Sequence, residues 1–442
     1  MKIKKTLSTN EYLFSIWCII ASFGTYFCMY AFRKPFNSAS YEGYYFLGMG
    51  YKSVLIISQV LGYMISKFTG VKVISELKAK SRSRVITVLV VSSYLPLVLF
   101  AFVPTPYHLI CLFLNGLPLG MVFGVVFSYL EGRRLTELIV SGLTISIIFS
   151  SSILKSIAQY LIQVVGVNEF SMPMVTASIF LPLFFGFVWM LEQIPAPNNE
   201  DIALKTIREP MSNREKIEML AKYGMGIFLL CFSYILLTVC RDFRDNFGVE
   251  IWSELGYGNH SEIYALGEMP VGLITLLGLM YLSTIKNNIK GFNQSLYFIL
   301  TGGLVLGCST LMFKIGLITP LVWMITAGSG LFFAYTPLQS VVFDRLIALF
   351  KMKGNAGFLI YICDSTGYMF SVALLLGKEW INYSDSWSIL FVNICLFTSF
   401  GVLASVFMAI LFFSFKKKWQ LLYENIHKKD IKNLIIHLSK QS

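Results

Sequence analysis

A dozen apolar segments, each about 20 residues long, set the strongest limit on what this chain can fold into. A helix of about 20 apolar residues is needed to cross the hydrocarbon core of a bilayer. Hydrophobic residues make up 56% of the 442 residues and charged residues only 14%, whereas soluble domains carry about 25% charged residues. A soluble core cannot absorb this much apolar surface, so the sequence predicts an all-α membrane protein.

The apolar segments predict twelve transmembrane helices. We expect these helices at residues 12–38, 51–70, 85–104, 107–130, 137–165, 171–191, 223–247, 263–284, 294–315, 319–343, 356–377 and 386–415. The chain then divides into an N-terminal six-helix bundle (1–191), a linker (192–222), a C-terminal six-helix bundle (223–415) and a tail (416–442). Prolines and mixed charges are typical of a linker, and the amphipathic tail is expected to lie on the membrane surface.

Basic residues are distributed unevenly among the connections between these segments. The N-terminus, the linker, the tail and the loops after the second, fourth, eighth and tenth segments carry most of the 36 lysines and arginines. Loops rich in positive charge stay in the cytoplasm. Both termini are therefore predicted to be cytoplasmic, with the chain in a bacterial inner membrane. This orientation accounts for the net charge of +12, so no nucleic-acid partner is expected.

Motifs of enzymes, metal sites and ATP-driven pumps are missing from the sequence. The eight cysteines all fall in apolar segments and form no CxxC pair, so they indicate buried thiols. No phosphate-binding loop, nucleophile elbow or metal-spaced histidine pair occurs. We expect a monomer that is not an enzyme and that has no cofactor and no metal site.

Two stretches about 210 residues apart share one pattern. The first contains Tyr26 and Arg33, and the second contains Tyr234 and Arg241. Because two helical turns take about seven residues, each tyrosine should share a helix face with its arginine. An arginine inside an apolar helix is costly and is usually functional or paired. The alternatives are an interfacial anchor for Arg33 and a local pair with Asp245 for Arg241.

The division into six and six helices around a charged linker resembles the major facilitator superfamily. The fourth and tenth segments each end where an acid adjoins arginine, with Glu131 before Arg133 and Arg134, and Asp344 before Arg345. These ends are similar to the gating loops of that superfamily. The resemblance implies two pseudo-symmetric bundles that expose a central site to each side of the membrane in turn.

Within that superfamily the chain resembles the organophosphate:phosphate antiporters. The run Phe23-Gly24, Tyr26 and Arg33-Lys34-x-Phe36 is similar to their helix 1 motif, and Arg241 stands where their helix 7 arginine does. The stretch Tyr-Ala-Phe-Arg-Lys-Pro-Phe also looks like that of a bacterial membrane protein family of unassigned function. The antiporter resemblance implies that the two arginines bind a phosphate group.

These patterns assign the remaining charges and tyrosines to two sets. The substrate-binding set comprises Arg33, Arg241, Tyr26, Tyr30, Tyr234, Lys155 and Tyr361. The coupling or interbundle set comprises Lys34, Asp245, Glu268, Asp364 and Lys67. Superfamily architecture implies pairs of Lys155 with Glu268 and of Lys67 with Asp364, while Lys34 can pair with Asp242 or Asp245. The alternatives are that the charges act as structural struts, and that the tyrosines serve packing or the membrane interface.

The resulting hypothesis is a secondary active transporter of a small organic anion. A phosphorylated metabolite is the expected substrate, with inorganic phosphate as the counter-substrate, because a guanidinium matches phosphate oxygens. One rival is a proton-coupled symporter in which Glu268 or Asp364 carries the proton. The other rival is a transporter-like membrane sensor.

Overall fold

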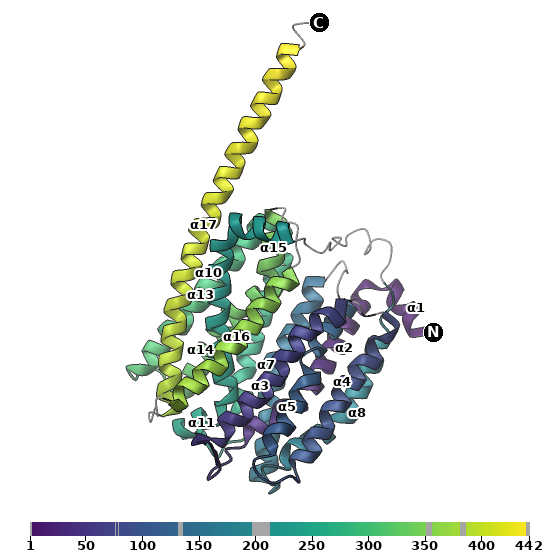
Figure 1. The fold of residues 1–442 in the computed structure, drawn as a ribbon, viewed down its shortest axis with the longest axis vertical. Coiled ribbons are helices and arrows are strands. Elements are labelled where there is room, and N and C mark those ends of the chain that lie inside the picture. The colour runs from purple at the N-terminus through teal and green to yellow at the C-terminus, as the bar shows by residue number, and fades with distance from the viewer. Residues whose placement is uncertain are drawn as a thin grey trace.

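Long helices run through most of the chain, as the apolar segments predict (Figure 1). The computed structural model of the protein describes residues 2–75, 77, 79–130, 136–196, 213–350, 356–380 and 386–438. The N-terminal half contains α1 (Lys2–Thr9), α2 (Glu11–Ala31), η1 (Pro35–Ser38), β1 (Tyr45–Phe46), β2 (Met49–Gly50), α3 (Tyr51–Ser75), η2 (Ala79–Ser81), α4 (Arg82–Phe100), α5 (His108–Leu119), α6 (Val122–Leu130), α7 (Thr136–Gln163) and α8 (Met172–Glu192).

The C-terminal half follows the same plan, without strands in its described residues. It contains α10 (Asn213–Asn246), α11 (Gly248–Trp252), η3 (Ser253–Tyr257), α12 (Ile263–Thr284), α13 (Asn288–Lys314), α14 (Pro320–Pro337), η4 (Leu338–Val342), α15 (Phe343–Leu349), α16 (Ala356–Trp380) and α17 (Trp387–Leu438). The strands β1 and β2 of the first half form a small antiparallel hairpin.

Membrane-spanning character is confirmed for most of the predicted segments. Among the described residues, eleven helices are long and apolar enough to cross a bilayer. The one predicted segment outside this set, 356–377, lies in α16, which has 25 residues and packs against both α10 and α3. The protein is therefore a multi-pass integral membrane protein.

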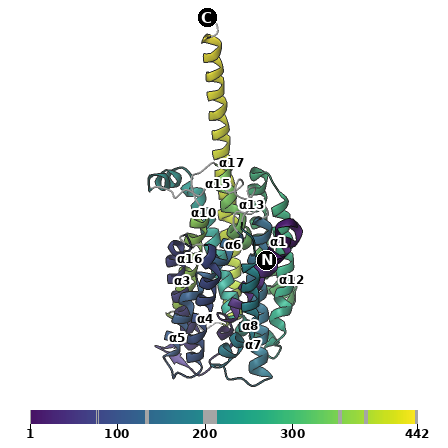
Figure 2. The same ribbon diagram turned by 90° about the vertical axis from the view of Figure 1, so that its right-hand side faces the viewer.

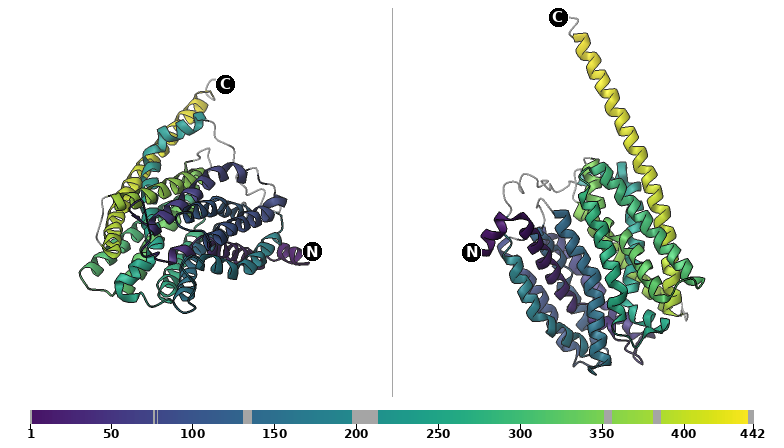
Figure 3. Two further views of the ribbon diagram at one scale, coloured as in Figure 1. Left: turned by 60° about the horizontal axis from the view of Figure 1, so that its bottom comes forward. Right: turned by 180° about the vertical axis from the view of Figure 1, so that it is seen from behind.

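Two helical bundles stand side by side (Figures 1 and 3). In the first, α2 packs on α7 and α8, and α5 packs on α3 and α4. In the second, α10 packs on α16 and α17, and α13 packs on α14 and α17. Helix packing joins the bundles where α7 meets α12 and where α3 meets α16, which are the neighbours that the superfamily resemblance implies. Both termini lie at one end, here called the terminal end, and α11 lies at the far end (Figure 1).

The first long helix ends at Ala31, whereas the sequence predicted a helix to residue 38. The backbone N–H of Phe32 closes the last turn on the carbonyls of Met29 and Tyr30. Pro35 then begins the 3-10 helix η1, because proline disfavours the helical conformation of the residue before it and suits a first helical position. Arg33 therefore lies in the turn after α2, and the predicted stacking of Tyr26 and Arg33 along one helix is wrong.

Other helix boundaries differ from the predicted ones, either because the helix is interrupted or because it extends further. The fourth segment breaks between Leu119 and Val122, just after Pro118, since a proline removes one backbone donor inside a helix. The tenth segment passes through the π-helical turn η4 before α15. The seventh begins as α10 at Asn213, inside the predicted linker.

The tail, which was predicted to lie on the membrane surface, forms a continuation of the last helix. α17 has 52 residues and runs to Leu438. Its end projects away from both bundles (Figures 1 and 2). The helix therefore does not turn across the terminal end as a surface-bound tail would.

Glycine permits a close crossing of α3 and α5 in the first bundle. A Cβ added at Gly62 of α3 would lie 2.2 Å from the carbonyl oxygen of Phe113, and one at Gly116 of α5 would lie 2.3 Å from that of Gln59. Small residues let membrane helices approach to this distance, where dispersion contacts hold them together. This crossing fixes α3 against α5, and both helices hold the end of α2.

Candidate functional site

A pocket lies between the two bundles, in the half of the molecule toward the far end. Its lining comes from the end of α2 and the turn that follows it, and from α7, α10, α11, α12, α14 and α16. We call it the central pocket. Eight charged side chains line it: Arg33, Lys34, Lys155, Arg241, Arg244, Asp242, Asp245 and Glu268. Charges gathered inside a membrane protein are costly and are generally functional.

Cations exceed carboxylates in the central pocket. Five of the eight charged side chains are lysine or arginine and three are aspartate or glutamate. With all of them ionised, the lining carries two positive charges in excess. A pocket with this balance attracts an anion, and a dianion would neutralise it.

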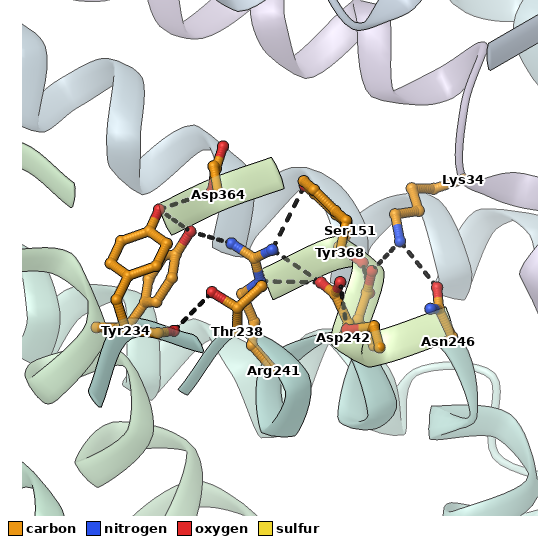
Figure 4. Close-up of polar contacts among 12 residues, drawn as sticks. Lys34, Ser151, Tyr234, Thr238, Arg241, Asp242, Asn246, Asp364 and Tyr368 are labelled. Atoms are coloured by element: carbon orange, nitrogen blue, oxygen red, sulfur yellow. Dashed lines mark hydrogen bonds and ion pairs between the residues drawn. The ribbon is translucent and has the colours of Figure 1, made fainter. Parts of the chain in front are cut away.

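Arg241 is held by a carboxylate and two phenols (Figure 4). Its Nη2 and Nε donate to Oδ1 of Asp242 at 2.8 and 3.1 Å. Its Nη1 donates to the hydroxyl of Tyr335, and Nη2 donates weakly to that of Tyr368 at 3.4 Å. The predicted alternative, a pair of Arg241 with Asp245, is not formed, because Asp242 occupies the guanidinium.

Arg33 has no such partner in the described part of the chain. Its side chain is buried, with 3% of the residue exposed, and its Nε finds no hydrogen-bond acceptor among the described residues. The guanidinium lies over the ring of Tyr63, with Cζ 3.6 Å from the ring centroid. Stacking on the ring of Tyr63 offsets only part of the free energy that is lost when the guanidinium is buried. Among the described residues that line the pocket, Arg33 is therefore the cation without a carboxylate partner.

The backbone around Arg33 is fixed by amide side chains of neighbouring helices. Where α2 ends, carbonyl groups lose their helical partners and must be satisfied elsewhere. Asn115 of α5 donates to the carbonyl of Phe32 at 2.9 Å, and Gln59 of α3 donates to that of Arg33 at 2.8 Å. Gln59 also donates to Asn115. These bonds hold the turn, so Arg33 is positioned by α3 and α5.

Asp245 joins the bundles at the edge of the central pocket. It accepts from Lys34, from Ser151 and, at 2.7 Å, from Lys155. Lys34 thus takes one of its two predicted partners, and it also donates to Asn246 at 3.0 Å (Figure 4). The predicted pair of Lys155 with Glu268 is wrong, because Asp245 takes Lys155.

Glu268 is paired with Arg244 within the second bundle. Arg244 comes from α10, one turn beyond Arg241, and it also donates to the carbonyl of Met324 at 2.8 Å. Arg244 is absent from the predicted binding set, although the run Arg241, Asp242, Arg244 and Asp245 in an apolar helix was a visible signal. The sequence predicted a role for Asp242 only as a possible partner of Lys34.

A second buried ion pair connects the bundles away from the central pocket. Lys67 of α3 pairs with Asp364 of α16, as the superfamily resemblance implied. Asp364 also accepts from the hydroxyl of Tyr234 at 2.7 Å, and that hydroxyl lies 3.1 Å from the hydroxyl of Tyr335 (Figure 4). Because Tyr335 contacts Arg241, a continuous polar chain runs from this ion pair to the pocket.

The candidate tyrosines have different positions. Tyr30 lines the central pocket, whereas Tyr26 packs on the rings of Tyr30 and Phe123 and does not line it. Tyr234 lies behind Arg241 and bonds Asp364 rather than facing the pocket. The side chain of Tyr361 lies outside the described residues.

The predicted gating arginines can be placed only in the second half. Glu131, Arg133 and Arg134 lie outside the described residues. Arg345 of α15 donates to the carbonyls of Ile285 at 2.8 Å and Leu282 at 3.2 Å, at the end of α12. Asp344 lies in the first turn of the same short helix. In this structure Arg345 thus caps the end of α12, and a gating role remains a prediction.

Comparison of the sequence with known families gives one assignment. Residues 35–418 match the family described as "Family of unknown function (DUF5690)". The chain belongs to this family. No curated protein matches the sequence. The matched residues cover nearly the whole of both bundles. Membership in the organophosphate:phosphate antiporter branch stays a prediction.

Solved structures show which fold this DUF5690 chain adopts. It is similar to a point mutant of the nucleoside transporter NupG, with a TM-score of 0.59 at 15% identity over 90% of this chain and 99% of that chain. It is also similar to NupG itself, with a TM-score of 0.57 at 15% identity over 90% and 98% of the two chains. These likenesses confirm the predicted major facilitator fold.

Proposed function

We propose that this protein is a secondary active transporter that moves a small organic anion by alternating access. The excess of two positive charges in the central pocket is the observation that carries the proposal. The pocket lies where the two bundles meet, so both halves contribute to it. In transporters built from repeats, the substrate site lies at such an interface, and rocking of one bundle against the other alternates access.

A phosphorylated metabolite is the proposed substrate. A phosphate group near neutral pH is a dianion, and its oxygens suit the planar fork of a guanidinium. Arg33 from the first bundle and Arg241 from the second both line the central pocket. The phosphate would bridge the two, and the rest of the metabolite would contact the aromatic lining, which includes Tyr30 and Tyr368.

Exchange against inorganic phosphate follows from the same charge excess. An empty pocket keeps its unbalanced positive charges, which repel one another strongly where the dielectric is low. A bound dianion removes this repulsion and lets the bundles reorient. Exchange of one anion for another is then easier than the return of an empty carrier.

Polar contacts at the far end are the proposed gate on that side. Lys52 pairs with Glu250 at 2.5 Å, and Gln163 donates to the carbonyl of Gly258 at 3.0 Å. Together with the contacts of Asp245, they tie the first bundle to the second. Opening at the far end requires that these contacts break, so the bound anion must stabilise the reoriented state by a comparable amount.

The experiment is uptake into proteoliposomes that contain the purified full-length protein. Vesicles are loaded with inorganic phosphate or left without it, and labelled phosphate, sugar phosphates, carboxylates and a nucleoside are offered outside. We expect uptake of a phosphorylated compound that depends on internal phosphate. Uptake into phosphate-free vesicles driven by a proton gradient would favour the symporter rival. Binding without any turnover would favour the sensor.

Lysine substitutions test the two arginines in the same assay. Arg33→Lys and Arg241→Lys should each lower transport at least about tenfold, because lysine lacks the forked donor and a charged hydrogen bond contributes about 1.5–3 kcal/mol. Arg84→Lys is the matched control, since Arg84 is exposed at the start of α4. Wild-type rates in both pocket variants would contradict the two-arginine site.

A further inference from the structure

Asp242 occupies the part of Arg241 that an incoming anion would need. One oxygen, Oδ1, accepts from both Nε and Nη2 of Arg241 (Figure 4). The opposite donor, Nη1, is directed to Tyr335, which does not line the central pocket, whereas Asp242 does. The donors of Arg241 that open to the pocket are thus filled by this carboxylate. An anion can form a forked contact with Arg241 there only by displacing Asp242.

A displaced Asp242 finds no spare cation among the described residues that line the pocket. Lys34 and Lys155 are committed to Asp245, and Arg244 is committed to Glu268. Outside the lining, Lys67 is held by Asp364. Arg33 is the remaining cation of the pocket lining, and in the proposed function it binds the same anion.

The neutral and acidic groups around Asp242 offer little in place of Arg241. Ser371 of α16 donates to Oδ2 of Asp242 at 3.1 Å. Tyr368 of α16 lies beside the guanidinium, while Asp245 of α10 and Glu268 of α12 add negative charge to the same lining. A displaced Asp242 would therefore keep one neutral hydrogen bond and face a bound anion as well as two carboxylates.

An ionised carboxylate in that position would be costly, because it would be buried without an opposite charge beside it. Loss of the opposite charge and the approach of like charges both favour its protonated form, and burial adds to this effect. A proton from the aqueous side would form an O–H bond on Asp242. When the anion leaves, that proton would be released and the contact with Arg241 would form again.

We propose that Asp242 is the proton-coupling residue of the central pocket, so that each anion bound at Arg241 brings one proton onto Asp242. The inference rests on the proposed anion site and adds what that site does with protons. In the proposed exchange, each anion then crosses with one proton in either direction, so a complete cycle moves no net proton. Neither Glu268 nor Asp364, the two acids that the sequence suggested for this role, loses its partner when an anion binds Arg241.

The coupling of anion binding to proton uptake has a measurable consequence. If one proton is taken up per anion, the affinity for the anion rises about tenfold for each unit by which pH falls, as long as Asp242 is ionised in the empty protein. Inorganic sulfate is a suitable probe, because it has the shape of phosphate and its own charge does not change near neutral pH. Trp252 lines the pocket and supplies a fluorescence signal.

The experiment measures the Kd of sulfate for the full-length protein in detergent as a function of pH. The wild type should show the tenfold slope. Asp242→Asn should show no slope and should bind more tightly than the wild type at the highest pH, because no carboxylate competes. Ser371→Ala should keep the slope and bind more tightly at each pH, since the ionised form of Asp242 loses a stronger hydrogen bond than the protonated form does. Glu254→Gln is the control, because Glu254 caps α17 outside the pocket.

Each outcome either supports or overturns the proposed role of Asp242. A flat wild-type profile, or the same slope in Asp242→Asn, overturns the role of Asp242 and leaves the anion site intact. If Asp242→Asn does not fold, the Ser371→Ala profile decides in its place, and affinities equal to those of the wild type overturn the inference. An absence of sulfate binding in all variants at every pH overturns the anion site and the inference together.

Discussion

Removal of Arg33 should make the protein more stable while it abolishes function. The perturbation is Arg33→Met, which replaces a buried guanidinium with an apolar side chain of similar length. The free energy of burying one ion amounts to several kcal/mol after relaxation, and the contact with Tyr63 returns about 2 kcal/mol. Since no carboxylate among the described residues pairs with Arg33, about 1–3 kcal/mol of destabilisation is left in the wild type.

Lys67→Met provides the matched comparison. Lys67 is also a buried cation at the bundle interface, but it pairs with Asp364. Its removal leaves that carboxylate with the hydroxyl of Tyr234, and breaking a buried pair in this way costs about 3–5 kcal/mol. The two substitutions should therefore change the free energy of unfolding in opposite directions, although both remove one positive charge.

The assay is reversible unfolding of the purified variants in detergent, together with uptake into vesicles. We expect Arg33→Met to raise the free energy of unfolding by about 1–3 kcal/mol and to lose uptake. Lys67→Met should lower that free energy. A loss of stability in Arg33→Met similar to that in Lys67→Met would refute the conclusion that Arg33 is an unpaired charge kept for a ligand.

Three further predictions concern the struts and the gate. Glu268→Gln should slow uptake but retain anion binding, because it weakens the contact with an arginine within one bundle; loss of binding would contradict this. Asp245→Asn should loosen the far end, since two lysines lose their carboxylate, and faster thiol labelling of a cysteine placed in the central pocket from that side would report it. Gly291→Ala should unfold at a lower temperature, because the new Cβ would lie 1.4 Å from Nη1 of Arg345, whereas Gly303→Ala on the same helix meets nothing closer than 3.4 Å and should match the wild type.

The architecture could be predicted from local properties of the chain. The number of spans follows from the length of the apolar segments, and the division into halves follows from the charged linker with its prolines. The eighth predicted segment, 263–284, matches α12 residue for residue. The end of the first helix was missed because Pro35, which begins the 3-10 helix η1, was included in the predicted helix 12–38.

Most of the charged residues of the pocket could also be identified from the sequence, because a charged residue in an apolar segment can be recognised without knowing how the helices pack. Arg33, Lys34, Lys155, Arg241 and Asp245 were all marked in this way, and all line one pocket.

The pairing of these charges, in contrast, depends on how distant helices pack. Asp245 could reach several cations on sequence grounds, and its partners are Lys34 and Lys155 because α2 and α7 both face the end of α10. Asp242 pairs with Arg241, and Arg33 has no carboxylate partner among the described residues. Pairing energy falls steeply with distance and depends on burial. Both quantities are set by the packing of helices that are far apart in the chain, so no local pattern encodes them.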